Sequence, residues 1–64
     1  MRVPMITDNV ITICYGKKRE WENREDARAF FADGVLNSEG SEQRRYATIL
    51  AKLEIGMYVC SDED

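Results

Sequence analysis

The sequence contains no histidine. Histidine is the most frequent general base and metal ligand in proteins, so its absence excludes Ser-His and Cys-His nucleophilic pairs. Two separated cysteines, Cys14 and Cys60, cannot complete a four-ligand zinc site without it. The four glycines fall at turns, helix ends or a packing position, and none forms a phosphate-cradling loop after a strand. We therefore expect no catalytic residue, no metal site and no cofactor, and a protein that is not an enzyme.

Cysteine is scarce, and the two that occur belong to no C-x-x-C pair. In a reducing compartment we expect both to be free thiols on small, buried or half-buried strand positions. A disulfide between Cys14 and Cys60 is the alternative if their strands are neighbours.

The sequence has no apolar run long enough to span a membrane, and its N-terminus lacks the apolar core of a signal peptide. We therefore expect a cytoplasmic protein that does not contact membranes. The net charge is −3, and three of the twelve acids lie at the very end as Asp62, Glu63 and Asp64. We expect residues 61–64 to form a solvated acidic tail, with a partner-contacting role as the alternative. The basic excess typical of nucleic-acid binders is missing.

A chain of 64 residues is one small domain. A domain this short buries only about 60% of the surface that its unfolded chain exposes. A domain of this size gains more than about 3–5 kcal/mol of stability only if its core is ideally packed, or if a covalent cross-link or a partner subunit supports it.

Two amphipathic helices are the clearest pattern that is present. Asn23 and Asp26 have the spacing of a helix start, and an apolar stripe follows them. We predict a first helix from Arg24 to about Ser38, with Gly34 on its inner side where another backbone comes close. Its alternative end is at Gly34. The stripe consists of Ala27, Phe30, Phe31, Gly34 and Val35.

Glu39-Gly40-Ser41 supplies a helix stop and a new cap, and Gly56 ends the next helix. We predict this second helix from about Glu42 to Ile55. The short connection forces an antiparallel helical hairpin. The apolar stripe of the second helix is Tyr46, Ile49, Leu50 and Leu53.

The β-branched run Val10 to Tyr15 predicts a strand, which turns at Gly16-Lys17-Lys18 and returns as Arg19 to Glu22. A three-residue loop is favoured because it sets Trp21 opposite Ile13, on one apolar face with Ile11 and Tyr15. A two-residue loop sets Trp21 across from Thr12 instead. The choice matters because a slip of one residue moves every side chain to the other face.

A last strand, Met57 to Cys60, is expected beside Val10–Tyr15, because a lone hairpin is marginal in water. The predicted fold class is α+β, in the order β-β-α-α-β: a three-stranded, mostly antiparallel sheet with the helical hairpin on one face. Residues 1–64 form a single small domain, and residues 1–9 an N-terminal arm. The uncovered face of the sheet is then a candidate protein-interaction surface, made of Thr12, Cys14, Tyr58 and Cys60.

The chain resembles short uncharacterised proteins of conjugative transposons and related mobile elements of Firmicutes. The likeness covers most of residues 10–62, and it implies a bacterial cytoplasm and an accessory gene, with no activity or site residue to transfer. It is carried by Ile11-Thr12-Ile13-Cys14-Tyr15-Gly16, by Glu22-Asn23-Arg24-Glu25-Asp26-Ala27 with Phe30-Phe31 and Gly34, and by Ser38-Glu39-Gly40-Ser41-Glu42 through Arg45-Tyr46, Ile49, Leu53, Gly56 and Cys60.

These observations favour a small non-enzymatic protein-interaction module, binding another protein or itself as a homodimer. The alternative is a nucleic-acid-binding accessory protein. Its candidate contacts are Arg24, Arg28, Arg44, Arg45 and the hairpin tip Lys17, Lys18 and Arg19.

Overall fold

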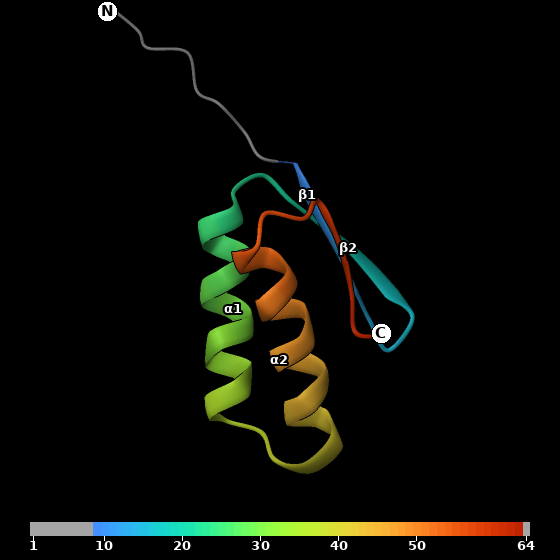
Figure 1. The fold of residues 1–64 in the computed structure, drawn as a ribbon, viewed down its shortest axis with the longest axis vertical. Coiled ribbons are helices and arrows are strands. Elements are labelled where there is room, and N and C mark those ends of the chain that lie inside the picture. Colours follow the sequence, from blue (N-terminus) through green and yellow to red (C-terminus); the bar gives the residue numbers. More distant parts are fainter. Residues whose placement is uncertain (1–8, 64) are drawn as a thin grey trace, which may run out of the picture.

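Two antiparallel helices lie on one side of a three-stranded sheet (Figure 1). The computed structural model describes residues 9–63, so the predicted N-terminal arm, apart from Asn9, and Asp64 lie outside the described residues. The elements are β1 (Val10–Cys14), β2 (Lys17–Trp21), α1 (Arg24–Leu36), α2 (Gly40–Glu54) and β3 (Val59–Ser61). The α+β class and the β-β-α-α-β order are confirmed.

The sheet has the strand order β2-β1-β3. β1 pairs with β2 in the antiparallel sense and with β3 in the parallel sense, so the sheet is mixed. The last strand lies beside β1, as expected, but it begins at Val59 and not at Met57. The helical hairpin makes the crossover that a parallel pair requires.

α1 begins at Arg24, as predicted, directly after Asn23 in extended backbone. The carbonyl of Asn23 accepts the N–H of Ala27 at 3.3 Å, while its side-chain amide donates to Asp26 and its side chain accepts no N–H of the first helical turn. The helix continues through Gly34 to Leu36, so the alternative end at Gly34 is wrong. A Cβ at Gly34 would lie 3.0 Å from the ring of Tyr46. The glycine thus admits an aromatic ring of α2, and not the second backbone that the sequence suggested.

α2 begins at Gly40, two residues before the predicted start. Its C-terminus is closed by Gly56, whose φ of +98° suits glycine. The N–H of Met57 donates to the carbonyl of Lys52 at 3.1 Å, and the N–H of Gly56 to that of Leu53 at 3.3 Å. This pair of bonds is the Schellman pattern, and it confirms the predicted helix end.

The β1–β2 hairpin turns at Tyr15 and Gly16, both with positive φ (55° and 76°). Positive φ at both central residues defines the type I′ turn, whose twist matches the flanking strands. Cys14 therefore pairs with Lys17, and Val10 pairs with Trp21. The predicted three-residue loop is wrong, and so is its pairing of Trp21 with Ile13.

This register reverses the predicted faces of the sheet. Val10, Thr12 and Cys60 point toward the helices and are 0%, 1% and 0% exposed. Trp21 leans over the same face and donates from Nε1 to Oγ1 of Thr12 at 2.9 Å, which satisfies the buried hydroxyl. The helices complete the core with Ala27, Phe31, Ile49 and Leu53.

The opposite face of the sheet carries Ile11 and Ile13 of β1 and Val59 of β3, because side chains alternate along each strand. Ile11 and Ile13 are half-buried, and Val59 is 53% exposed. Within residues 9–63, both helices lie against the other face (Figure 1). We call these three residues the open sheet face.

Candidate functional site

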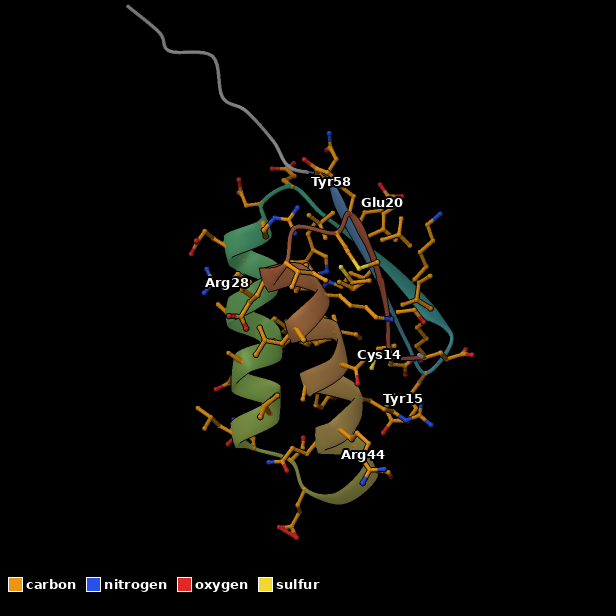
Figure 2. All side chains as sticks on the ribbon, viewed as in Figure 1. Cys14, Tyr15, Glu20, Arg28, Arg44 and Tyr58 are labelled. Atoms are coloured by element: carbon orange, nitrogen blue, oxygen red, sulfur yellow. The ribbon has the colours of Figure 1, made fainter. Side chains whose placement is uncertain are left out.

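The structure does not assemble the interaction face that the sequence predicted. Thr12 and Cys60 are buried beneath the helices, and Cys14 is half-buried on the same side. Tyr58 precedes β3 and is 60% exposed, with the guanidinium of Arg24 5.1 Å from its ring centroid. Figure 2 places Tyr58 and Cys14 toward opposite ends of the sheet. The prediction of one exposed surface from these four residues is wrong because it rested on the wrong hairpin register.

Both cysteines are free thiols. Burial raises the pKa of the Cys60 thiol, although Arg24 and Lys52 oppose the shift. Burial likewise raises the pKa of Cys14, and the carboxylate of Asp62 adds to the shift. Because both pKa values are raised, both thiols are poor nucleophiles at neutral pH. The two cysteines are not opposite each other on the neighbouring strands, since the residue opposite Cys60 on β1 is Thr12.

Three of the predicted nucleic-acid contacts form hydrogen bonds or ion pairs with other residues of the protein. Arg24 donates from Nη1 to the carbonyls of Leu53 and Met57, each at 2.8 Å, and so holds the end of α2. Arg28 pairs with Glu25 at 3.1 Å on the side of α1 that faces away from the sheet (Figure 2). Arg45 pairs with Asp62.

The other predicted cations are exposed. Lys17, Lys18 and Arg19 belong to β2 rather than to the hairpin loop, and Arg44 lies near the start of α2. Alternation along β2 sets Lys17 and Arg19 on the helix side of the sheet and Lys18 on the open side. The structure therefore divides the basic hairpin tip between two faces.

Asp62 joins three elements that are remote in sequence. Its Oδ2 accepts the backbone N–H of Tyr15 at 2.9 Å and Nη1 of Arg45 at 2.8 Å, while its own N–H donates to Ile13. Its side chain is 2% exposed. The hydrogen bond from Tyr15, with help from Arg45, holds the pKa of Asp62 below its usual value. Asp62 is a structural clamp, so its assignment to a solvated acidic tail is wrong.

A groove of about 360 Å³ opens between the hairpin end of the sheet and the helices. We call it the hairpin groove. One wall is formed by the helix-side residues of the strands and the other by aromatic rings of α1 and α2. Its principal lining is Cys14, Lys17 and Arg19 from the strands and Phe30, Phe31 and Tyr46 from the helices.

The rings and cations of the hairpin groove are held in place by their neighbours. Arg19 stacks on Trp21 with its Cζ 4.0 Å from the ring centroid, and it also lies 5.1 Å from the centroid of Phe30. Phe31 contacts Phe30 edge to face at 5.1 Å and Tyr46 at 5.8 Å between centroids. Phe30 nevertheless remains 46% exposed. An ordered aromatic wall beside two cations is a preformed site for an apolar group with a negative charge.

Sequence reasoning missed the hairpin groove because it set Trp21 and the strand side chains on the wrong face. A Tyr15-Gly16 turn was the available signal, since glycine at the second loop position favours a two-residue hairpin.

Other features give weaker candidates. A hollow of about 590 Å³ lies where α1 ends and α2 begins, and its lining of Val35, Gly40, Gln43, Arg44 and Ala47 includes no aromatic ring. Over the described range, no group of three potential metal ligands gathers. Neither helix of residues 9–63 has the length and apolar character needed to span a bilayer.

Comparisons with known proteins add no relative. No protein-family model matches the chain, and neither curated proteins nor solved structures yield a match. The resemblance to proteins of mobile elements therefore stays a prediction.

Proposed function

We propose that this protein is a small non-enzymatic interaction module that forms a homodimer through its open sheet face. The observation that carries the proposal is the apolar patch on β1 and β3 in that face, beside which β2 contributes the charged Lys18 and Glu20. Ile11, Ile13 and Val59 lie side by side on neighbouring strands, and Val59 is 53% exposed. Apolar side chains grouped on one face of a sheet are typical of contact surfaces.

The size of the core supports the same proposal. Among residues 9–63 the buried apolar side chains are few: Val10, Ala27, Phe31, Ile49, Leu53 and Cys60. A second copy would bury further apolar area and would stabilise the fold by mass action. The proposed setting is that of an accessory protein of a mobile genetic element in a bacterial cytoplasm, which rests on the resemblance alone.

Light scattering coupled to size exclusion tests the proposal. We expect a dimer mass at about 100 µM chain, which corresponds to a modest interface. Val59→Lys sets a charge on the open sheet face and should return the protein to a monomer. Leu36→Lys is the matched control, because Leu36 is 83% exposed at the far end of α1 and should leave the dimer intact. A monomeric wild-type protein at that concentration would contradict the proposal.

Nucleic-acid binding is the second candidate, supported by the exposure of Lys17, Lys18, Arg19 and Arg44. The engagement of Arg24, Arg28 and Arg45 within the fold reduces the charge available to it. Its signature is binding to single- or double-stranded DNA at about 50 mM salt that weakens steeply as salt rises. Absence of binding under those conditions removes this candidate.

A further inference from the structure

We infer that the hairpin groove is a second binding site, which takes an acidic peptide segment of a partner protein with one large aromatic anchor side chain. The site lies on the helix side of the sheet, so the inference is independent of the proposed dimer. Its basis is the combination of an aromatic wall, a preformed hollow and two cations on the opposite wall.

The size and surface of the hairpin groove fit one anchor side chain. Its volume of about 360 Å³ lies at the lower end of the range of ligand pockets. Phe30 lines the groove and is 46% exposed, so part of its ring is accessible to a bound group. An aromatic side chain placed against Phe30 and Phe31 would extend the edge-to-face contact that these rings already make.

The charged residues around the hairpin groove predict the orientation of a bound peptide. Lys17 and Arg19 lie on the strand wall, and no carboxylate is among the residues that line the hairpin groove. The carboxylate at the hairpin end is that of Asp62, which accepts the N–H of Tyr15 and is paired with Arg45. At the helix end, Tyr46 donates from its hydroxyl to Glu42 at 3.3 Å, so a carboxylate stands just beyond that ring. A bound segment would therefore place its acids beside Lys17 and Arg19, with its anchor directed toward Tyr46.

The same geometry argues against a nucleic acid in this groove. A nucleic-acid strand carries one negative charge per nucleotide and needs cations along its whole path. The hairpin groove offers two, and the ring of Tyr15 is already occupied by the guanidinium of Arg45 at 4.5 Å. A peptide can match two cations with two acids and insert a single side chain.

Two native probes report on the hairpin groove. Trp21 is the single tryptophan, and it contacts both Arg19 and Phe30, so its fluorescence should change when the groove fills. Cys14 lines the groove, whereas Cys60 is 0% exposed. A bound peptide should therefore slow alkylation of Cys14, with Cys60 as the internal reference.

The experiment titrates the full chain with a short synthetic peptide of glutamate and aspartate around one central phenylalanine. We expect a saturable change in Trp21 fluorescence and protection of Cys14. Replacing the phenylalanine of the peptide by alanine should weaken binding by at least about 10-fold, because the anchor supplies the buried apolar area. A peptide of the same length with lysine in place of the acids should not bind.

Lys17→Glu and Lys18→Glu form a matched pair, since they change the same charge at adjacent positions on opposite faces of β2. We expect Lys17→Glu to weaken the peptide by about 5- to 10-fold at low salt and Lys18→Glu to have a much smaller effect. Circular dichroism checks that both variants fold. Cys14→Leu, which narrows the groove without changing charge, should also weaken binding.

Four results would overturn the inference. The first is an equal loss of affinity for the acidic peptide in the Lys17→Glu and Lys18→Glu variants, and the second is equal binding of the alanine and phenylalanine peptides. The third is an oligothymidylate that binds as tightly as the acidic peptide. The fourth is protection of Cys14 by self-association of the protein without any peptide. The dimer test on Val59→Lys is separate, so failure of one proposal leaves the other standing.

Discussion

The carboxylate of Asp62 accepts a hydrogen bond from the backbone N–H of Tyr15 at 2.9 Å, across 47 positions of the sequence. Tyr15 occupies the left-handed region that costs most residues energy, with φ at 55°. The same carboxylate oxygen accepts Nη1 of Arg45 from α2. One buried side chain thus links the hairpin turn, the end of β3 and the helical layer.

Asp62→Ala should destabilise the protein by about 2 kcal/mol, because it removes charge-assisted bonds and leaves the N–H of Tyr15 without its acceptor. The measurement is the urea midpoint at neutral pH. Glu63→Ala is the control, because Glu63 is exposed, is adjacent to Asp62 and carries the same negative charge. Equal midpoints for the two variants would refute the clamp.

The decrease in the free energy of unfolding at acid pH should also depend on Asp62. Its pKa is lowered in the folded state, chiefly by the hydrogen bond from Tyr15 and further by Arg45. The folded state therefore binds fewer protons than the unfolded state, so this contribution is complete above about pH 5 and is lost as pH falls below about 4. Asp62→Asn should lower stability near pH 7 and flatten the loss between about pH 5 and pH 3. An unchanged decrease at acid pH in the variant would contradict the assignment.

Arg24→Ala should cost about 1–2 kcal/mol, because the guanidinium joins the start of α1 to the carbonyls of Leu53 and Met57 at the end of α2. Arg28→Ala is the comparison one turn along the same helix. Its exposed pair with Glu25 should contribute less than about 0.5 kcal/mol. Thermal unfolding of both variants measures the difference, and similar losses would speak against a joining role for Arg24.

Gly34 and Tyr46 should be energetically coupled. A Cβ at Gly34 would lie 3.0 Å from the ring of Tyr46, which opposes the gain of about 1 kcal/mol that alanine normally brings to a helix interior. Gly34→Ala should therefore gain less than this in the wild type and the full amount in the Tyr46→Ala background. A double-mutant cycle by urea unfolding tests the coupling, and additive effects would exclude it.

The two thiols should differ in reactivity. Cys60 is 0% exposed and Cys14 is half-buried, and burial raises the pKa of both. A chromogenic disulfide reagent near pH 8 should react slowly with Cys14 and negligibly with Cys60 in the folded protein. Two thiols per chain should react in urea without reductant. The absence of any reactive thiol in urea would indicate a disulfide between Cys14 and Cys60, which the structure does not contain.

The hairpin illustrates where local reasoning failed. Placing Trp21 with Ile11 and Ile13 gathers the largest apolar side chains on one face, and that preference selected the wrong loop. The indole also carries an N–H that requires an acceptor when it packs, and Thr12 supplies one. In the resulting register Thr12 and Cys60 are buried beneath the helices, while Ile11 and Ile13 lie on the uncovered face. The candidate interaction face was therefore wrong, while the existence of an uncovered face was right.

The roles of Arg24, Asp62 and Gly34 were invisible for a related reason. Each depends on a partner that is distant in sequence: Arg24 on the end of α2, Asp62 on the hairpin turn, and Gly34 on a ring of the other helix. Periodicity and capping rules describe neighbours within about one or two turns, so they assigned these residues to a basic surface, an acidic tail and a close backbone contact.

The amino-acid order alone determined the helical hairpin, the glycine that ends it, the first strand and the succession of elements, since caps, β-branching and apolar spacing act over a few residues. Tertiary structure alone decided which side of the sheet meets the helices. Both faces of β1 are apolar enough to be buried, so the outcome depended on contacts between remote elements: the indole–hydroxyl bond from Trp21 to Thr12 and the fit of Cys60 beside Thr12.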